Sequence, residues 1–357
     1  MVITTLDSLI ERVMAEDAKK YDFLADTRRM SVSITEKTED EGPRLLLNVD
    51  ESGVAETFHV SDHARGQMAT DLGIPKRYFD RMVETAPELL KQNTHHWLYA
   101  EPTRRMIRAR TQQPELPAAR AWLSDRYRRL DNIEIARKLL PEFDRLSEEV
   151  VFHNASVTDE KFYLRATFPR LTSEVKVGEP VQWGVQIKNS EVGAATFAIE
   201  SFVLTLACTN GMVVGKVLNA RHIGKRLDES LSDEAIQADD RAFWLAARDM
   251  LRASISETEF EKVISTLRET TDGVRITAPI AATERLAKEF SLSEAEQEAV
   301  LTSLASGGDF SRWGALSAIT NAAQTVESFD RRVEMEEMGW SLATATNREW
   351  ERIAVAA

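Results

Sequence analysis

The sequence predicts an α+β protein in which an antiparallel β-meander core is flanked by helices and followed by a helical C-terminal module. A β-rich middle segment contains consecutive strand candidates separated by short polar turns. From about residue 234 onward, helical periodicity replaces strand alternation. The composition, 43% hydrophobic and 29% charged, is typical of a globular chain. We therefore expect three parts, namely an N-terminal α/β portion (1–103), a central β-rich core (104–230) and an acidic helical module (231–357).

The N-terminal portion begins with a predicted amphipathic helix. Apolar residues recur at helical spacing through residues 5–24. Segments 28–36 and 44–50 are rich in strand formers around a polar turn, which predicts a hairpin. Ser61 is a suitable N-cap for the helix that follows, and Gly73 is suited to end it. Pro75 then opens a second helix.

Strand candidates fill the centre of the chain. Residues 104–110 alternate charged and apolar side chains, and residues 118–124 continue this tendency after a proline-containing turn. A helix is predicted from about Ile133 to Leu146. Further strand candidates then follow at 150–156, 161–168, 181–190, 196–208 and 212–217.

The C-terminal third is predicted to be helical. A long helix is expected over 234–257, and Ser293 with Glu296 forms a capping box ahead of another apolar run. Gly307 and Gly308 break the helical pattern before a last group of helices.

Several features bear on the compartment. The single cysteine, Cys208, lies in an apolar run, which favours a buried thiol in a reducing environment. No stretch approaches the roughly 18 to 20 apolar residues of a membrane helix, and the N-terminus lacks the features of a signal peptide. We therefore expect a cytoplasmic protein that does not interact with membranes.

The formal charge of −13 is unevenly distributed. Residues 228–357 contain 13 Lys and Arg against 25 Asp and Glu, whereas the preceding residues are nearly neutral. The acidic helices have a simple interpretation as solvated faces. Alternatively, they shield a basic face of the same protein or dock a basic partner.

Arginines are concentrated at residues 104–129, where eight of them meet only two acids and aromatic residues are interleaved. Cations that neutralise phosphates and aromatic rings that stack on bases are what single-stranded nucleic acid requires. A second basic cluster follows at 216–226. The predicted nucleic-acid-binding residues are Arg104, Arg108, Arg110, Trp122, Arg126, Tyr127, Arg128, Arg129, Lys216, Arg221, Lys225 and Arg226. The competing interpretation is that these arginines pair with acids elsewhere in the protein.

Two turn segments also have alternative interpretations. Residues 123–132 predict a strand end that leads into a helix capped by Asp131 or Asn132, braced by an Asp–Arg network or open to a ligand. The segment NSEVG predicts either a polar hairpin turn or a loop tip that contacts a ligand or a neighbouring subunit. In the second case Glu191 accepts from an arginine, and the contact residues are Lys188, Asn189, Ser190 and Glu191. Asn189 and Gly193 tolerate positive φ, and Asn210-Gly211 suits a type I′ turn.

Catalytic and metal-binding patterns are not found in the sequence. His59 and His63 have helical zinc spacing, but the cap at Ser61 places them on different elements, and we expect no metal. His95 and His96 lie downstream. No glycine-rich phosphate loop or nucleophile elbow is present, so we expect no cofactor and do not expect an enzyme.

Three blocks, LSDRYRRLDN (123–132), IKNSEVGAATFAIESFVLTLACTNGM (187–212) and SRWGALSAITNAAQ (311–324), support a resemblance, together with residues 64–82. In order and spacing they resemble the phage and plasmid family called domain of unknown function 932, over nearly all of residues 25–325. The family has no established activity, but its members recur in mobile elements among genes that handle DNA. The helix, β-meander, helix order is also similar to the core of phage single-strand annealing proteins, a likeness of topology alone.

Together these observations favour a non-enzymatic protein of a phage, prophage or plasmid. It would bind single-stranded nucleic acid, with annealing as a further option, and assist recombination or replication as a homo-oligomer. The alternative is a protein-interaction or host-interference factor of a mobile element that does not bind nucleic acid.

Overall fold

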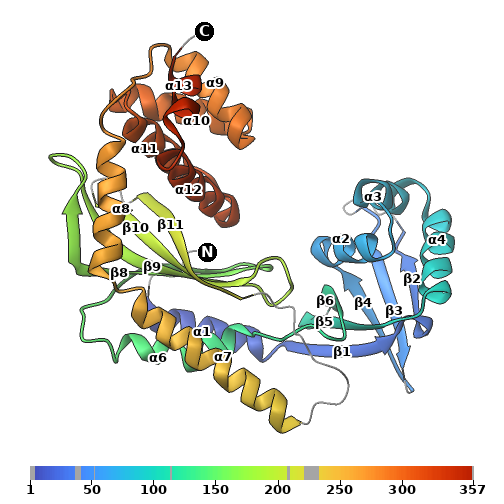
Figure 1. The fold of residues 1–357 in the computed structure, drawn as a ribbon. Coiled ribbons are helices and arrows are strands. Elements are labelled where there is room, and N and C mark those ends of the chain that lie inside the picture. Colours follow the sequence, from blue (N-terminus) through green and yellow to red (C-terminus); the bar gives the residue numbers. More distant parts are fainter. Residues whose placement is uncertain are drawn as a thin grey trace.

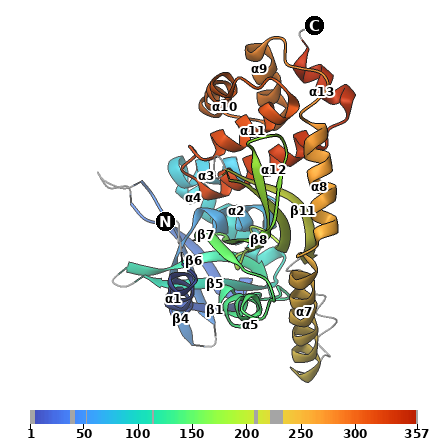
Figure 2. The ribbon, with the colours of Figure 1, turned by 90° about the vertical axis from the view of Figure 1, so that its left-hand side faces the viewer.

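The structure is a computed structural model with the α+β fold that the sequence predicts (Figures 1 and 2). It describes residues 5–36, 42–51, 53–112, 115–206, 210–220 and 233–355. Two separate β-sheets organise the chain, and a helical C-terminal region follows them.

The first sheet has six strands in the order β1-β5-β6-β4-β3-β2. These are β1 (Lys20–Asp26), β2 (Met30–Ile34), β3 (Leu45–Glu51), β4 (Val54–Val60), β5 (Arg104–Gln112) and β6 (Glu115–Ser124). Neighbouring strands are antiparallel except for β4 and β6. The helices that pack against this sheet are α2 (Asp62–Asp71), α3 (Lys76–Thr85) and α4 (Pro87–Ala100).

The second sheet is an antiparallel meander in the order β11-β10-β9-β8-β7. Its strands are β7 (Val151–Val157), β8 (Phe162–Glu174), β9 (Pro180–Asn189), β10 (Phe197–Thr205) and β11 (Asn210–Ala220). Below it in Figure 1 lie α1 (Leu6–Asp17), α5 (Asn132–Lys138), α6 (Leu140–Phe143) and α7 (Asp233–Ala253). The predicted meander core with flanking helices is therefore confirmed.

The C-terminal helices are α8 (Glu257–Glu269), α9 (Pro279–Phe290), α10 (Glu294–Gly307), α11 (Arg312–Ala323), α12 (Phe329–Ala343) and α13 (Asn347–Ala354). Phe260 of α8 packs on Trp183 in the main core, with 5.6 Å between the ring centres, whereas α9 to α13 lie on the other side of the second sheet (Figure 1). We call α9 to α13 the C-terminal bundle. The capping box predicted at Ser293 and Glu296 is present at the start of α10.

Side-chain alternation on β8 separates two chemically different faces of the second sheet. Phe162, Leu164 and Ala166 enter the main hydrophobic core, because alternate residues of a strand point to opposite faces. The residues between them point to the opposite face, which we call the polar sheet face. It comprises Tyr163, Arg165 and Thr167 on β8, Gln182, Gln186 and Lys188 on β9, and Glu200 and Phe202 on β10.

Several predicted boundaries were wrong. The first helix ends at Asp17, and the remainder of the predicted segment forms strand β1. The predicted domain boundary at 103/104 cuts the first sheet, because β5 and β6 pair with β1 and β4. The helix predicted over 133–146 is split into α5 and α6, with Pro141 in the first turn of the second, where the missing N–H of proline is tolerated.

The predicted type I′ turn at Asn210-Gly211 was also wrong, because both residues lie in strand β11 and Gly211 has no positive φ. A Cβ at Gly211 would lie 2.4 Å from the ring of Phe202 and 3.2 Å from the Arg165 guanidinium. Glycine is needed here for the close approach of side chains. Gly193, in contrast, has φ of +79°, as the sequence predicts.

Candidate nucleic-acid interface

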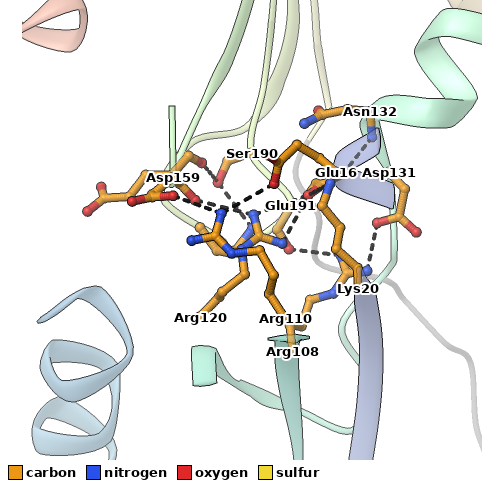
Figure 3. Close-up of polar contacts among 12 residues, drawn as sticks. Glu16, Lys20, Arg108, Arg110, Arg120, Asp131, Asn132, Asp159, Ser190 and Glu191 are labelled. Carbon is orange, nitrogen blue, oxygen red and sulfur yellow. Dashed lines mark hydrogen bonds and ion pairs between the residues drawn. The ribbon is translucent and has the colours of Figure 1, made fainter. Parts of the chain in front are cut away.

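Two of the arginines predicted to bind nucleic acid, Arg108 and Arg110, lie at the junction of the two sheets (Figure 3). Arg108 on β5 is only 4% exposed. Its Nε lies 2.9 Å from Asp22 Oδ1 and its Nη2 lies 2.7 Å from Asp131 Oδ1, while Nη1 donates to the backbone carbonyl of Glu191 at 2.9 Å. Each guanidinium nitrogen is thus engaged within the protein.

Glu191 is the acidic centre of the same junction and is 2% exposed. Its carboxylate lies 2.6 Å from Lys20 Nζ and 3.2 Å from Arg120 Nη1, and it accepts from the backbone N–H of Asn132 at 3.0 Å. Burial would raise the pKa of Glu191, but the charges of Lys20 and Arg120 and the hydrogen bonds from Lys20 and Asn132 lower it to about 2. The carboxylate is therefore ionised and holds both sheets together.

The other arginines of the block mostly have acidic partners as well. The pairs are Arg105–Asp71, Arg110–Glu16, Arg110–Asp159, Arg128–Asp239, Arg128–Asp240 and Arg129–Asp22. Arg104 and Arg126 are exposed and have no ion-pair partner among the residues that the structure describes. Most of these arginines therefore pair with acids elsewhere in the protein, as the competing interpretation of the sequence expects.

The two aromatic residues predicted to stack on bases are also engaged in the interior. Trp122 is 4% exposed and donates from Nε1 to Asp71 Oδ2 at 2.9 Å. Tyr127 donates to the carbonyl of Ser190 at 3.2 Å, and burial raises the pKa of its hydroxyl. Trp122 is therefore buried and Tyr127 is partly buried, whereas stacking on an unpaired base requires an accessible ring face.

The NSEVG segment connects β9 to β10 and is buried where the two sheets meet. Asn189 and Ser190 have no exposed surface. Asn189 donates to the carbonyl of Leu130 at 2.8 Å, and Ser190 Oγ donates to the carbonyl of Glu160 at 2.6 Å. The predicted exposed loop tip was wrong, whereas the predicted acceptance by Glu191 from an arginine is confirmed through Arg120.

The turn before α5 is braced by the expected Asp–Arg network. Asp131 is the N-cap of α5, but its side chain pairs with Arg108 and makes no cap hydrogen bond. Burial raises the pKa of Asp131, against the opposing charge of Arg108.

The second predicted basic cluster lies mostly outside the described residues. Lys216 lies in β11 but its side chain is not described, and Arg221, Lys225 and Arg226 lie outside the described residues, as does Cys208. Among the described residues, no group of three or more His, Cys, Asp and Glu could hold a metal ion. Within the same residues, no helix is both long and apolar enough to cross a membrane.

The polar sheet face is a cationic and aromatic surface that the sequence analysis missed. Lys161, just before β8, continues the row of Tyr163 and Arg165. Arg165 Nε donates to Gln186 Oε1 at 2.7 Å, and its guanidinium carbon lies 4.8 Å from the centre of the Phe202 ring. The alternation of KFYLRATF already separates these residues from the core set, and this signal could have revealed the face.

This face is covered by carboxylates of α12. Arg165 forms a two-point ion pair with Glu336, of which Nη1 to Oε1 measures 3.1 Å. Lys188 Nζ lies 3.3 Å from Glu337 Oε1, and Lys161 Nζ lies 3.8 Å from Asp330 Oδ1. Three cations of the sheet thus meet three carboxylates of one helix.

No family model, curated protein or solved structure matches the chain.

Proposed function

We propose that the chain is a non-enzymatic protein that binds single-stranded nucleic acid through the polar sheet face. Lys161, Arg165 and Lys188 would neutralise phosphates, and Tyr163 and Phe202 would stack on bases. Kinship to the phage and plasmid family is supported by the sequence blocks at 123–132, 187–212 and 311–324. A role in recombination or replication and homo-oligomer formation are part of the same proposal.

The observation that carries the proposal is the row of cations that faces a row of anions. On α12, Asp330, Glu336 and Glu337 occupy positions opposite successive cations of β8 and β9. A phosphate backbone also presents negative charges in a row, and base stacking uses aromatic rings beside such cations. Phe329 of α12 lies 5.1 Å from the ring of Tyr163, in the position that a base would take.

The arginine block fits a structural role better than this function. Arg108 and Arg120 are buried and hold carboxylates of both sheets. Removing a buried cation from its partner would leave an unpaired charge, at a cost of about 3–5 kcal/mol. A nucleic acid would have to disrupt the junction to reach these two groups.

Salt-titrated binding of a labelled single-stranded oligonucleotide tests the proposal. The variant Lys161→Gln with Lys188→Gln should bind more weakly, and the slope of log affinity against log salt should fall by about 1.4, because each neutralised phosphate contributes about 0.7 on single strands. Arg104→Gln with Arg126→Gln is the matched control, since both arginines are exposed and unpaired among the described residues. Loss of binding in the control variant alone would contradict the proposed face.

A second candidate function is supported by the same geometry. The anions that meet the polar sheet face belong to a protein helix, so an acidic helix of another protein could take this place. In that case the chain would be a protein-interaction factor. Binding of a labelled acidic peptide that oligonucleotide does not displace, with no binding of oligonucleotide itself, would favour this alternative.

A further inference from the structure

We infer that the C-terminal bundle is a built-in competitor for the polar sheet face, and that its carboxylates must leave before an anionic ligand can bind there. The inference rests on the proposed function and adds its regulation. It follows from how charge, packing and chain connection are arranged where the bundle meets the second sheet.

Among the described residues, the ion pairs across this contact all have one polarity, while Glu179, just before β9, accepts a hydrogen bond from Trp313 of the bundle. In each of four ion pairs the sheet provides the cation and the bundle provides the carboxylate. The pairs are Lys161–Asp330 at 3.8 Å, Arg165–Glu336 at 3.1 Å, Lys176–Asp309 at 2.7 Å and Lys188–Glu337 at 3.3 Å. The bundle thus presents the negative charge that a polyanion would bring, and the two cannot occupy the face together.

The covered face is chemically unsuited to permanent burial. Arg165 and Glu336 are 3% and 0% exposed, and Gln186 and Glu200 lie beside them, also buried. Desolvating such groups is expensive, and apolar residues of similar volume would often stabilise a permanent contact at least as well. Polar and charged side chains are expected on this face if it is exposed to solvent or to a ligand in a second state.

The packing between bundle and sheet is incomplete. A cavity of about 310 Å³ separates α10 and α11 from the ends of β9, β10 and β11, and it is lined by Lys176, Thr205, Asn210, Ser303 and Asn321 among others. The Asn210 side-chain oxygen is buried there without a hydrogen-bond partner. This end of the contact is therefore less densely packed than a protein interior, whereas Met212 of β11 belongs to the same core cluster as Leu316 and Ile319 of the bundle.

For the bundle to turn while α8 stays in place, the hydrogen bond from the Trp313 N–H to the Thr270 carbonyl at the end of α8, 2.9 Å long, has to break. Arg268 of α8 donates to the backbone carbonyl of Glu174 on β8 at 2.8 Å. Between α8 and α9, Gly273 has φ of +88°, a conformation that other residues rarely adopt. Hinge motion commonly uses a few such residues between packed elements.

A reversible link between α12 and the sheet tests the inference in the full-length chain. Lys188→Cys and Glu337→Cys are combined with Cys208→Ser, which removes the only natural cysteine. A bis-methanethiosulfonate linker joins the two new thiols, and a reducing agent releases them. Binding of labelled oligonucleotide is measured on the same sample before and after release.

Each result of this experiment has a distinct meaning. We expect the linked protein to lose at least tenfold in affinity and the released protein to regain it. Equal binding by linked and released protein would overturn the competitor role and leave the proposed function standing. If neither form nor the wild-type chain binds at low salt, the proposed function fails and the inference fails with it.

Charge variants on α12 give an independent check. Asp330→Asn with Glu337→Gln removes two partly exposed pairs and should tighten binding by about 2- to 30-fold, the equivalent of such pairs at their usual strength. Glu334→Gln is the control, because Glu334 lies on the same helix but pairs with Arg331 of that helix. An equal effect of the control would show that net charge, not release of the face, sets the affinity.

Discussion

Replacing Glu191 by glutamine is the most direct test of the sheet junction. Glutamine keeps the shape of the side chain but removes the charge that meets Lys20 Nζ at 2.6 Å and Arg120 Nη1 at 3.2 Å. Breaking a buried ion pair from one side costs about 3–5 kcal/mol. Because a whole domain is stable by only about 5–15 kcal/mol, the variant should show a large drop in the free energy of unfolding.

The pH dependence of the same variant provides a second measurement. The pKa of Glu191 falls from its ordinary 4.5 to about 2 in the folded protein. A lowered folded-state pKa gives stability that is present above about pH 4.5 and lost as the pH falls toward 2. The shift corresponds to about 3 kcal/mol. The wild-type chain should lose this amount on acidification, and Glu191→Gln should not.

Urea unfolding at pH 7 and at several acidic pH values measures both effects. The contributions of all other carboxylates to the pH dependence cancel in the difference between the unfolding free energies of wild type and variant. Glu160→Gln is the matched control, because Glu160 is 44% exposed and faces His63 at 3.8 Å. We expect less than about 1 kcal/mol from the control. A similarly small effect of Glu191→Gln, or an unchanged pH slope, would refute the argument that this carboxylate joins the sheets.

Three further predictions concern stability. In thermal melts, Gly211→Ala should lower the unfolding free energy by about 1–3 kcal/mol, because its Cβ would lie 2.4 Å from the Phe202 ring. Gly215→Ala is the control and should have a much smaller effect, because its Cβ would have no neighbour within 4 Å. Glu296→Ala should cost about 1–2 kcal/mol, because Glu296 closes the α10 capping box and pairs with Arg331 at 2.8 Å, and Glu294→Ala in the first turn of the same helix should cost less. Val177→Asp should change stability by less than about 0.5 kcal/mol in urea unfolding, since Val177 is 94% exposed; a larger loss would show that this turn is covered in solution.

Local patterns in the sequence were enough to predict most elements of the fold. Ser61 caps α2 by accepting from the N–H of Ala64 at 3.2 Å, and Gly73 ends the helix with φ of +66°. These features depend on residues close in the chain, so they can be inferred before any contact is known. The meander was predictable for the same reason, since its strands follow one another through short turns.

The candidate site was less predictable because it depends on partners that are distant in sequence. Arg108 is paired with Asp22 and Asp131, and its sequence neighbours give no indication of either. The sequence predicted a charged face on β5 but could not show that Asp22 of the adjacent strand β1 and Glu191 of the β9–β10 connection contact Arg108. Likewise, Gly211 was assigned to a turn because it follows Asn210 in the sequence. The Phe202 ring that requires glycine at this position lies on the neighbouring strand, which the local sequence does not reveal.

The position of α1 has a consequence for the nascent chain on the ribosome. Leu9 and Val13 of α1 belong to the core of the second sheet, together with α5 and β7, although β1 directly after it belongs to the first sheet. At usual elongation rates, α1 emerges on the order of ten seconds before residues 132–157 that cover it. During synthesis the apolar side chains of α1 are therefore accessible to chaperones. The first sheet begins to form while α1 still lacks the residues of the second sheet against which it packs.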